Sequence, residues 1–231
     1  MIGVVIPTCS EGKTLLKELD ARLIYQDNAF EIYESTVAKR DVLIVLTGYG
    51  KVKIGNALSY LRNNYQIDCL IGVGNCGSLD CKTRFFDIAI SCDAVQSDVN
   101  FTSLGYERGE IPGTNMIYYP SSQGLINAAC NATKKLGYQT WIGRFASGDR
   151  FVARNNVSER IKNMYDADFI DSECGCCGEM AGIYGIPYLY IKGISNRAGN
   201  NAVNEYLENA NEANQRACCT VYEMLKCLTT D

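Results

Sequence analysis

The side chains available for chemistry in this sequence are carboxylates and amides, because its 231 residues include no histidine. This absence excludes an imidazole general base and the Ser-His-Asp and Cys-His nucleophile sites. Glu11 stands directly beyond the apolar segment 2–6, where α/β sheets place ligand-binding groups, with a solvated loop glutamate as the alternative. Asn196 closes the apolar segment 188–194, where a turn-forming asparagine is the simpler interpretation.

Two short motifs resemble phosphate-binding loops but fail on their surroundings. Residues 7–14 end in Gly-Lys-Thr, yet Pro7 replaces the leading glycine and Glu11 places negative charge where phosphates must sit. Residues 72–77 have the spacing G-x-G-x-x-G, yet the polar segment 78–84 lacks the apolar stripe of the helix that a dinucleotide site requires. The glycines at 72–77 predict either backbone that approaches a flat ligand closely or ordinary tight turns.

The twelve cysteines are predicted to be free and mostly buried thiols, because they are scattered through apolar segments. Cys174 and Cys177 make one C-x-x-C spacing, but no second pair follows at the distance typical of a zinc site. The sequence therefore predicts neither a metal nor a cofactor.

Six short, continuously apolar segments have the composition of strands that are buried on both faces. They are residues 2–6, 42–47, 69–73, 86–91, 167–170 and 188–194. Segments with helical periodicity alternate with them, at residues 52–63, 121–135, 155–164, 178–184 and 202–228. The alternation predicts an α/β fold with one central sheet flanked by helices. No linker, charge block or internal repeat divides residues 1–231, so we expect a single domain.

Charge and hydropathy exclude several classes of partner. The net charge is −4 and the lysines and arginines are dispersed rather than striped, so we expect neither nucleic acid nor an anionic membrane as a partner. The apolar runs are far shorter than the roughly 20 residues that cross a bilayer. The first residues lack the basic region and cleavage site of a secretory signal, so we expect a cytoplasmic protein that acts on a small molecule.

Seven segments, taken in order, resemble the nucleoside phosphorylase/nucleosidase superfamily, and within it the hydrolases of 5′-methylthioadenosine and S-adenosylhomocysteine. They are residues 3–6 with Glu11, 48–52, 74–79, 105–113, 147–151, Glu173 fourteen residues before Pro187, and 193–196. The resemblance implies a single nucleoside phosphorylase-like domain with a central mixed sheet, a homodimer, and an active site at the strand ends. The activity it implies is hydrolysis of the N-glycosidic bond of a purine nucleoside.

The resemblance also implies roles for the candidate site residues. Glu11 matches the carboxylate that orients and deprotonates the attacking water. Glu173 matches the carboxylate that holds the ribose hydroxyls, with a helix N-terminal glutamate as the structural alternative. Phe151 matches the ring that stacks on the purine, with Val152 offering backbone hydrogen bonds to the base edge. Without the resemblance, an ordinary core aromatic would explain Phe151 equally well.

Further substrate contacts follow from the same resemblance. The contacts expected in the chain's own pocket are Asn75, Cys76, Gly77 and Ser172. A second set lies near or within the loop that is expected to reach the 5′-substituent pocket of the neighbouring subunit, and it consists of Phe101, Tyr106 and Pro112. Ser172 replaces a methionine that is usual in the family. Gly72 stands where the phosphorylases carry an arginine that grips phosphate, so water is the expected acceptor of the ribosyl group.

Asn196 departs from the family pattern, because the adenine-specific hydrolases carry an aspartic acid there that protonates purine N7. An amide donates a hydrogen bond but no proton, and general acid catalysis contributes about 10²–10⁴-fold. The main prediction is a hydrolase of methylthioadenosine and adenosylhomocysteine, since the loop 105–113 belongs to that subfamily. The alternatives are a hydrolase of 6-oxopurine nucleosides of futalosine or inosine type, and a catalytically impaired nucleoside-binding protein. A pure binding protein need not keep both Glu11 and Glu173, so their presence favours an enzyme.

Overall fold

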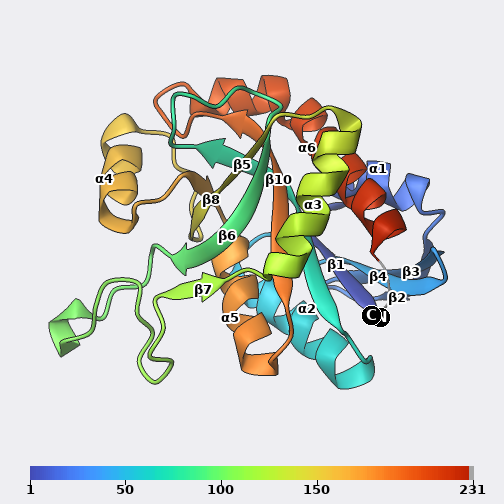
Figure 1. Ribbon diagram of the computed structural model, residues 1–231. Helices are drawn as coiled ribbons and strands as arrows, with labels where there is room; N and C mark the ends of the chain where they lie inside the picture. The colour runs from blue at the N-terminus through green and yellow to red at the C-terminus, as the bar shows by residue number, and fades with distance from the viewer. Residues whose placement is uncertain (229–231) are drawn as a thin grey trace.

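Four apolar runs form parallel strands within one ten-stranded mixed sheet of the computed structural model, which describes residues 1–228 (Figure 1). The parallel strands are β1 (Ile2–Ile6), β4 (Arg40–Leu46), β5 (Cys69–Ser78) and β10 (Tyr188–Asn196). Every residue of β1 and β10 is buried, as expected for strands that are covered on both faces. Because the four strands are parallel, their carboxyl ends meet at one edge of the sheet.

The other strands extend the sheet on one side and close it on the other. Beyond β4 lie the antiparallel strands β3 (Glu31–Val37) and β2 (Arg22–Gln26). Strand β10 also pairs with β6 (Ile88–Gln96), which continues through β8 (Thr140–Ser147) and β9 (Phe169–Asp171) back to β5. Strands β5, β10, β6, β8 and β9 therefore form a closed ring, and the short β7 (Tyr118–Pro120) pairs with β6 outside it.

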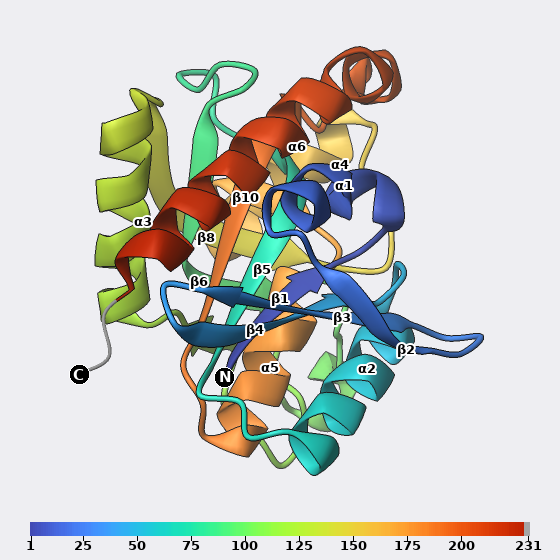
Figure 2. The same cartoon turned by 90° about the vertical axis from the view of Figure 1, so that its right-hand side faces the viewer.

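Amphipathic helices cover the two faces of the sheet. On one face lie α1 (Cys9–Glu18), α3 (Gln123–Leu136) and α6 (Ala202–Cys227), and Figure 2 shows α6 crossing over β10 and β5 with α1 beside it. On the opposite face lie α2 (Lys51–Asn64) and α5 (Cys174–Tyr184). The helix α4 (Asn155–Tyr165) lies apart from both layers and packs near the ends of β6, β8 and β9. No helix of residues 1–228 is both long and apolar enough to span a membrane.

The α/β class and the six predicted strand segments are confirmed, with shifts at their ends. The strand predicted from residue 86 begins at Ile88, because Phe86 has a left-handed backbone with φ 71°. The helix predicted over 178–184 begins at Cys174. The glycine-rich segment 72–77 lies within strand β5, so the tight turns considered for it are wrong.

One α-helix and four strands were not predicted: α1, the edge strand β2, its neighbour β3, and the strands β7 and β8. The strands β2 and β3 are half exposed and mix polar with apolar residues, so neither contains a continuous apolar run. Strand β7 has only three residues. Helix α1 contains Gly12 and several charged residues, which hide its narrow apolar face. Each missed element is stabilised by its neighbours more than by its own composition.

Candidate active site

A cavity of about 340 Å³ opens at the edge where the parallel strands end. It contains all four residues that the sequence places at the centre of the site, although they come from four separate parts of the chain. The lining residues are Glu11, Tyr49, Asn75, Cys76, Gly77, Arg150, Phe151, Val152, Ile170, Asp171, Ser172, Glu173, Ser195, Asn196, Ala198 and Tyr206.

Glu11 lies in the first turn of helix α1 rather than in a solvated loop, and only 7% of its surface is exposed. Thr8 caps this helix, because its Oγ1 accepts a hydrogen bond from the backbone N–H of Glu11 (3.3 Å). The Glu11 carboxylate accepts hydrogen bonds from Thr8 Oγ1 (3.2 Å), Tyr49 Oη (3.1 Å) and Asn75 Nδ2 (3.2 Å). All three donors are neutral, so Glu11 is held in place without a cation bonded to it.

Glu173 occupies the N-cap position of helix α5 and is buried, but its side chain makes no capping hydrogen bond. Its Oε2 instead accepts a hydrogen bond from the ammonium of Lys192, a fully buried residue of β10. The same ammonium lies 3.0 Å from Asp171 Oδ2. The helix-capping explanation of Glu173 is therefore incomplete, because its carboxylate belongs to a buried cluster of charges.

Burial raises the pKa of Glu173 above its ordinary value. The positive charge of Lys192 lowers this pKa, whereas the negative charges of Asp171 and Glu11 raise it further. Burial alone would lower the pKa of Lys192, but the two carboxylates beside it raise that pKa well above its ordinary value. Three carboxylates thus face one buried ammonium. Such a negative surrounding suits a ligand that gains positive charge during reaction.

Hydrogen bonds on both sides fix the orientation of the Asn196 amide, which is 4% exposed. The backbone N–H of Ala198 donates to Asn196 Oδ1 (2.9 Å), and Asn196 Nδ2 donates to Ser195 Oγ (3.1 Å). Ser195 Oγ uses its only proton to donate to the carbonyl of Cys76 (3.2 Å), so it must accept from Asn196. Asn196 therefore offers a ligand one N–H and one lone pair of Oδ1, and no transferable proton.

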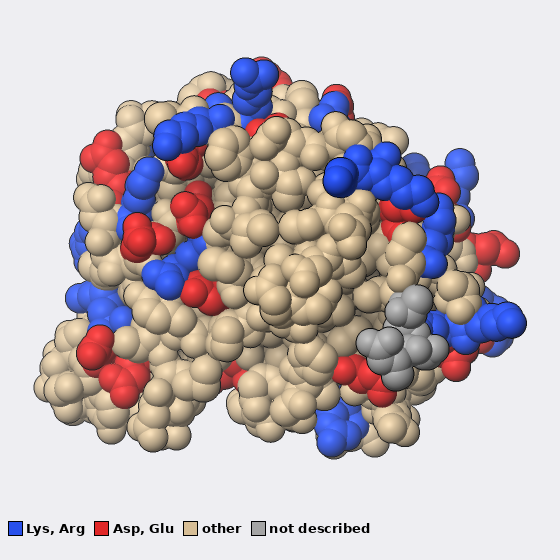
Figure 3. Space-filling view, viewed as in Figure 1, with Lys and Arg blue, Asp and Glu red and all other residues tan. Residues whose placement is uncertain are grey.

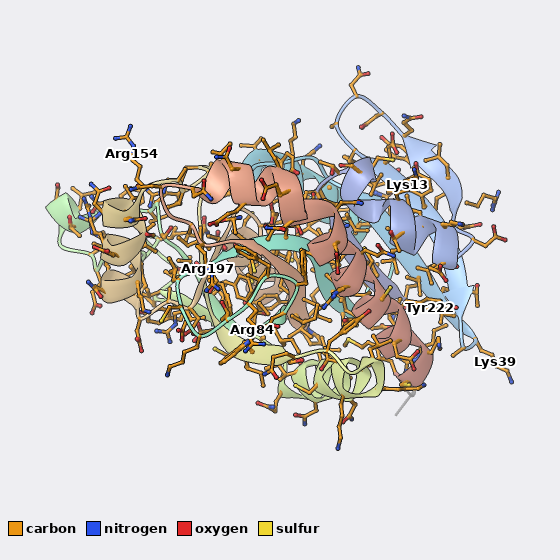
Figure 4. The ribbon with its side chains drawn as sticks, turned by 90° about the horizontal axis from the view of Figure 1, so that it is seen from above. Lys13, Lys39, Arg84, Arg154, Arg197 and Tyr222 are labelled. Atoms are coloured by element: carbon orange, nitrogen blue, oxygen red, sulfur yellow. The ribbon has the colours of Figure 1, made fainter. Side chains whose placement is uncertain are left out.

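Arg197 secures the segment directly behind Asn196. Its guanidinium donates to the carbonyls of Asp80 (2.9 Å) and Thr83 (2.6 Å) in the loop between β5 and β6. In Figure 4, Arg197 lies inside the molecule close to this loop, whereas Arg154 points away from the protein. The end of β10 is thus tied to the end of β5, which keeps Asn196 opposite Gly77.

An aromatic wall closes the cavity on the side of Phe151. The ring of Phe151 is 54% exposed, so the alternative of an ordinary core aromatic is wrong. It meets Tyr206 of helix α6 edge to face, with ring centroids 5.6 Å apart and an interplanar angle of 74°. Val152, the next residue, is buried. A ring that stands free at a cavity wall is available to stack on a flat ligand.

The remaining sequence-predicted residues divide into two groups. Asn75, Cys76, Gly77, Val152 and Ser172 line the cavity, as expected from the sequence. The second group does not line the cavity of its own chain and consists of Phe101, Tyr106 and Pro112. All three belong to the segment 97–117 between β6 and β7. This segment extends away from the body of the protein at the lower left of Figure 1.

Sequence reasoning missed Asp171, Lys192, Tyr49 and Tyr206. A signal for Lys192 was present, because a lysine inside the apolar segment 188–194 is almost never buried without a partner. Tyr49 stands within the Gly48-Tyr49-Gly50 motif, but nothing in that motif shows that its hydroxyl reaches Glu11. Tyr206 lies in the predicted helical segment 202–228, and nothing in that pattern shows that its side chain reaches the cavity.

The described residues contain no grouped metal ligands, and the face in Figure 3 carries charges of both signs. Among residues 1–228, no group of three or more Cys, Asp or Glu side chains has the arrangement of a metal site. On the face in Figure 3, basic and acidic side chains are interspersed and form no stripe of one sign.

Comparison with known proteins identifies clear relatives. The family model described as the phosphorylase superfamily matches residues 1–226. The 5′-methylthioadenosine/S-adenosylhomocysteine nucleosidase of Halalkalibacterium halodurans is 30% identical over 190 residues, which cover 80% of this chain and 82% of the relative. The nucleosidase of Staphylococcus carnosus is 29% identical over 231 residues, which cover 99% of this chain and 100% of the relative.

Two solved structures show the same fold. The 5′-methylthioadenosine/S-adenosylhomocysteine nucleosidase from Neisseria meningitidis, in complex with methylthio-immucillin-A, has a TM-score of 0.93 at 25% identity and covers 98% of this chain and 99% of its own. The futalosine hydrolase of Helicobacter pylori has a TM-score of 0.93 at 18% identity, with coverage of 98% and 97%. At that identity the second likeness concerns the fold alone.

Proposed function

Because the chain belongs to the 5′-methylthioadenosine/S-adenosylhomocysteine nucleosidase family of the phosphorylase superfamily, we propose that it hydrolyses the N-glycosidic bond of such purine nucleosides and releases the free base. The main support for this proposal is that Glu11, Glu173 and Phe151 line the same cavity. Two carboxylates and a free aromatic ring match the needs of a reaction in which a flat base departs from a sugar that becomes cationic.

Each side chain has a separate task in the proposed reaction. Glu173 accepts hydrogen bonds from the ribose hydroxyls, and these bonds strengthen as the sugar gains positive charge. Glu11 takes a proton from the attacking water, since its neutral partners leave the carboxylate free to act as a base. Phe151 stacks on the base, and the backbone of Val152 recognises the base edge.

Water is the proposed acceptor of the ribosyl group. The arginine that would grip phosphate in a phosphorylase has no room here, because a Cβ at Gly72 would lie 2.1 Å from the ring of Tyr190. The ring therefore fills the place of any longer side chain. A phosphate ion would find no such cation at this position.

Asn196 supports a second candidate function, the hydrolysis of 6-oxopurine nucleosides of futalosine or inosine type. Its fixed amide donates a hydrogen bond to the departing base without protonating it. A 6-oxopurine leaves more readily without protonation than adenine does, because its carbonyl oxygen shares the negative charge. An adenine nucleoside would be cleaved more slowly by the same site.

Chromatography of reactions with methylthioadenosine, adenosylhomocysteine, inosine and futalosine, each with and without phosphate, tests the proposal. We expect free base from methylthioadenosine or adenosylhomocysteine at a rate that phosphate does not change. Faster release of hypoxanthine from inosine or futalosine would favour the second candidate. Binding without any free base would identify a catalytically impaired nucleoside-binding protein and contradict the proposed hydrolysis.

The working form that we propose is a cytoplasmic homodimer. All twelve cysteines are unpaired, which suits a reducing compartment. Phe101, Tyr106 and Pro112 would complete the 5′-substituent pocket of the second copy, since they do not line the cavity of their own chain. With methylthioadenosine and adenosylhomocysteine as substrates, the reaction would contribute to methionine salvage.

A further inference from the structure

We propose that Lys192 is a positioning residue of this active site, which holds Glu173 ionised and aimed at the ribose hydroxyls; this role rests on the proposed nucleoside hydrolysis. The side chain of Lys192 is fully buried in the middle of β10. Its ammonium donates to Glu173 Oε2 and lies 3.0 Å from Asp171 Oδ2. One cation therefore joins two strands of the ring and the N-terminus of helix α5.

The two carboxylates beside Lys192 are bonded differently. Asp171 is saturated by the protein, because Oδ1 accepts from Ser147 Oγ while Oδ2 accepts from the backbone N–H of Cys174 (3.0 Å) and faces Lys192. Glu173 has only the bond from Lys192 to its Oε2, so within residues 1–228 its Oε1 has no hydrogen-bond partner. Asp171 thus anchors the lysine, and Glu173 keeps an oxygen free for the substrate.

Lys192 also lies close to the carboxylate that we assign as the base. A Cβ built on Gly74 would lie 3.4 Å from Glu11 Oε1 and 3.6 Å from Lys192 Nζ, so both groups face the space above this glycine. The ionisable side chains that influence Glu173 or are influenced by it are Lys192, Asp171, Glu11, Tyr190, Tyr206 and Cys76. Lys192 is the only cation among them.

Removing the ammonium would leave three carboxylates around one cavity without a buried cation. Their mutual repulsion favours uptake of a proton, and Glu173 takes it most readily because it has the fewest hydrogen bonds. Protonated Glu173 loses the negative charge that stabilises a cationic sugar and part of its capacity to accept from two hydroxyls. Loss of Lys192 should therefore weaken ribose binding and shift the acidic limb of the pH profile upward.

Three variants distinguish a positioning role of Lys192 from a purely structural one. Lys192→Met removes the charge, Lys192→Arg keeps it, and the double variant Asp171→Asn, Lys192→Met removes the lysine together with its anchor. For each we would measure thermal unfolding and the pH dependence of kcat and KM. The infrared band of the protonated Glu173 carboxyl is identified as the band that is absent in Glu173→Gln. Its titration with pH in the free protein reports the ionisation of Glu173 without any substrate.

The double variant decides the matter, because it should fold even if Lys192→Met does not. The double variant loses both the attraction of Lys192 and the smaller repulsion of Asp171, and it also loses the hydrogen bond that Lys192 donates to Glu173. We therefore expect its KM to rise about 10-fold or more, and its acidic limb and the infrared midpoint of Glu173 to move up by about one pH unit or more. Lys192→Arg should keep the wild-type midpoint. Wild-type KM and an unmoved midpoint in the double variant would show that Lys192 only balances Asp171, and would overturn the proposal.

The infrared result also separates the two proposals from each other. If the wild-type protein released no base from any nucleoside, the proposed hydrolysis would fail. The midpoint of Glu173 would still show whether Lys192 sets its ionisation, since that measurement needs neither substrate nor turnover.

Discussion

Among the residues of the site, Glu11 and Glu173 differ in their surroundings, and the difference suits them to different tasks. Glu11 accepts from a threonine, a tyrosine and an asparagine, which orient a carboxylate without neutralising it. Glu173 is held by an ammonium, and its pKa is raised by burial. A carboxylate with a raised pKa is ionised only at higher pH, so the proposed activity should rise with pH through the titration of Glu173.

Asn196→Asp is the most informative single substitution. The new carboxyl would keep the bond from the N–H of Ala198 and replace the amide nitrogen with an oxygen that can carry a proton to N7. We expect base release from methylthioadenosine to increase about 10-fold or more, measured as kcat/KM by chromatography. The exposed substitution Asn127→Asp serves as the matched control and should change nothing.

An unchanged rate on methylthioadenosine would contradict the view that Asn196 limits proton transfer to the base. Loss of cleavage of inosine or futalosine in Asn196→Asp would instead indicate that the asparagine sets a preference for 6-oxopurines. The two outcomes therefore distinguish the proposed main substrates from the second candidate.

At the level of elements, the site depends on segments that begin or end at one edge of the sheet. Helix α1 follows β1 and carries Glu11 in its first turn, and helix α5 follows β9 and carries Glu173 at its N-cap. Strands β5 and β10 run side by side and bring Asn196 opposite Gly77. Both carboxylates thus lie near the positive ends of helices, which favours negative charge.

Thr8→Ala tests whether the cap of α1 also positions Glu11. Thr8 Oγ1 accepts from the N–H of Glu11 and donates to its carboxylate, so the change removes both bonds. Loss of such a cap costs about 1 kcal/mol of stability, measurable by urea unfolding. We expect kcat to fall as well, whereas Thr8→Ser should keep both properties. A loss of stability with unchanged kcat would limit Thr8 to a structural role.

At the level of the whole molecule, several large apolar side chains that do not line the cavity are exposed to solvent. Val52 of α2 is 86% exposed, Leu104 is 73% exposed and Ile183 of α5 is 64% exposed. Where exposed apolar side chains gather into one contiguous patch, the patch commonly marks a protein–protein interface. Together with the extended loop that contains Phe101 and Tyr106, they support the proposed homodimer.

Leu104→Glu should weaken the homodimer, because it places a charge on a surface that association would bury. We expect sedimentation equilibrium to show more monomer at equal protein concentration. KM for adenosylhomocysteine should rise more than KM for inosine, since only the former carries a large 5′ substituent. Ile142→Glu, at a residue of β8 that is 54% exposed, is the control. A wild-type protein that sediments as a monomer would refute the homodimer.

The sequence by itself determined the class of the fold, the buried strands and the identity of nine residues in the cavity, among them the four at its centre. Strands buried on both faces appear as continuous apolar runs, which depend only on neighbouring residues. The order of motifs placed Glu11, Phe151, Glu173 and Asn196, and the structure brings all four to one cavity. Local pattern did not reveal α1, β2 or β3, because these elements depend on packing against the rest of the sheet.

Only the tertiary structure decided which groups act on those four residues. Lys192 and Glu173 are nineteen residues apart in the sequence, and Tyr49 and Glu11 are thirty-eight apart, yet each pair is hydrogen-bonded. The amide of Asn196 is oriented by a chain of bonds that reaches Cys76, and Phe151 is exposed at a cavity wall rather than packed in the core. Such contacts arise from the closure of the strand ring, and neither composition nor spacing specifies which distant side chains it will bring together.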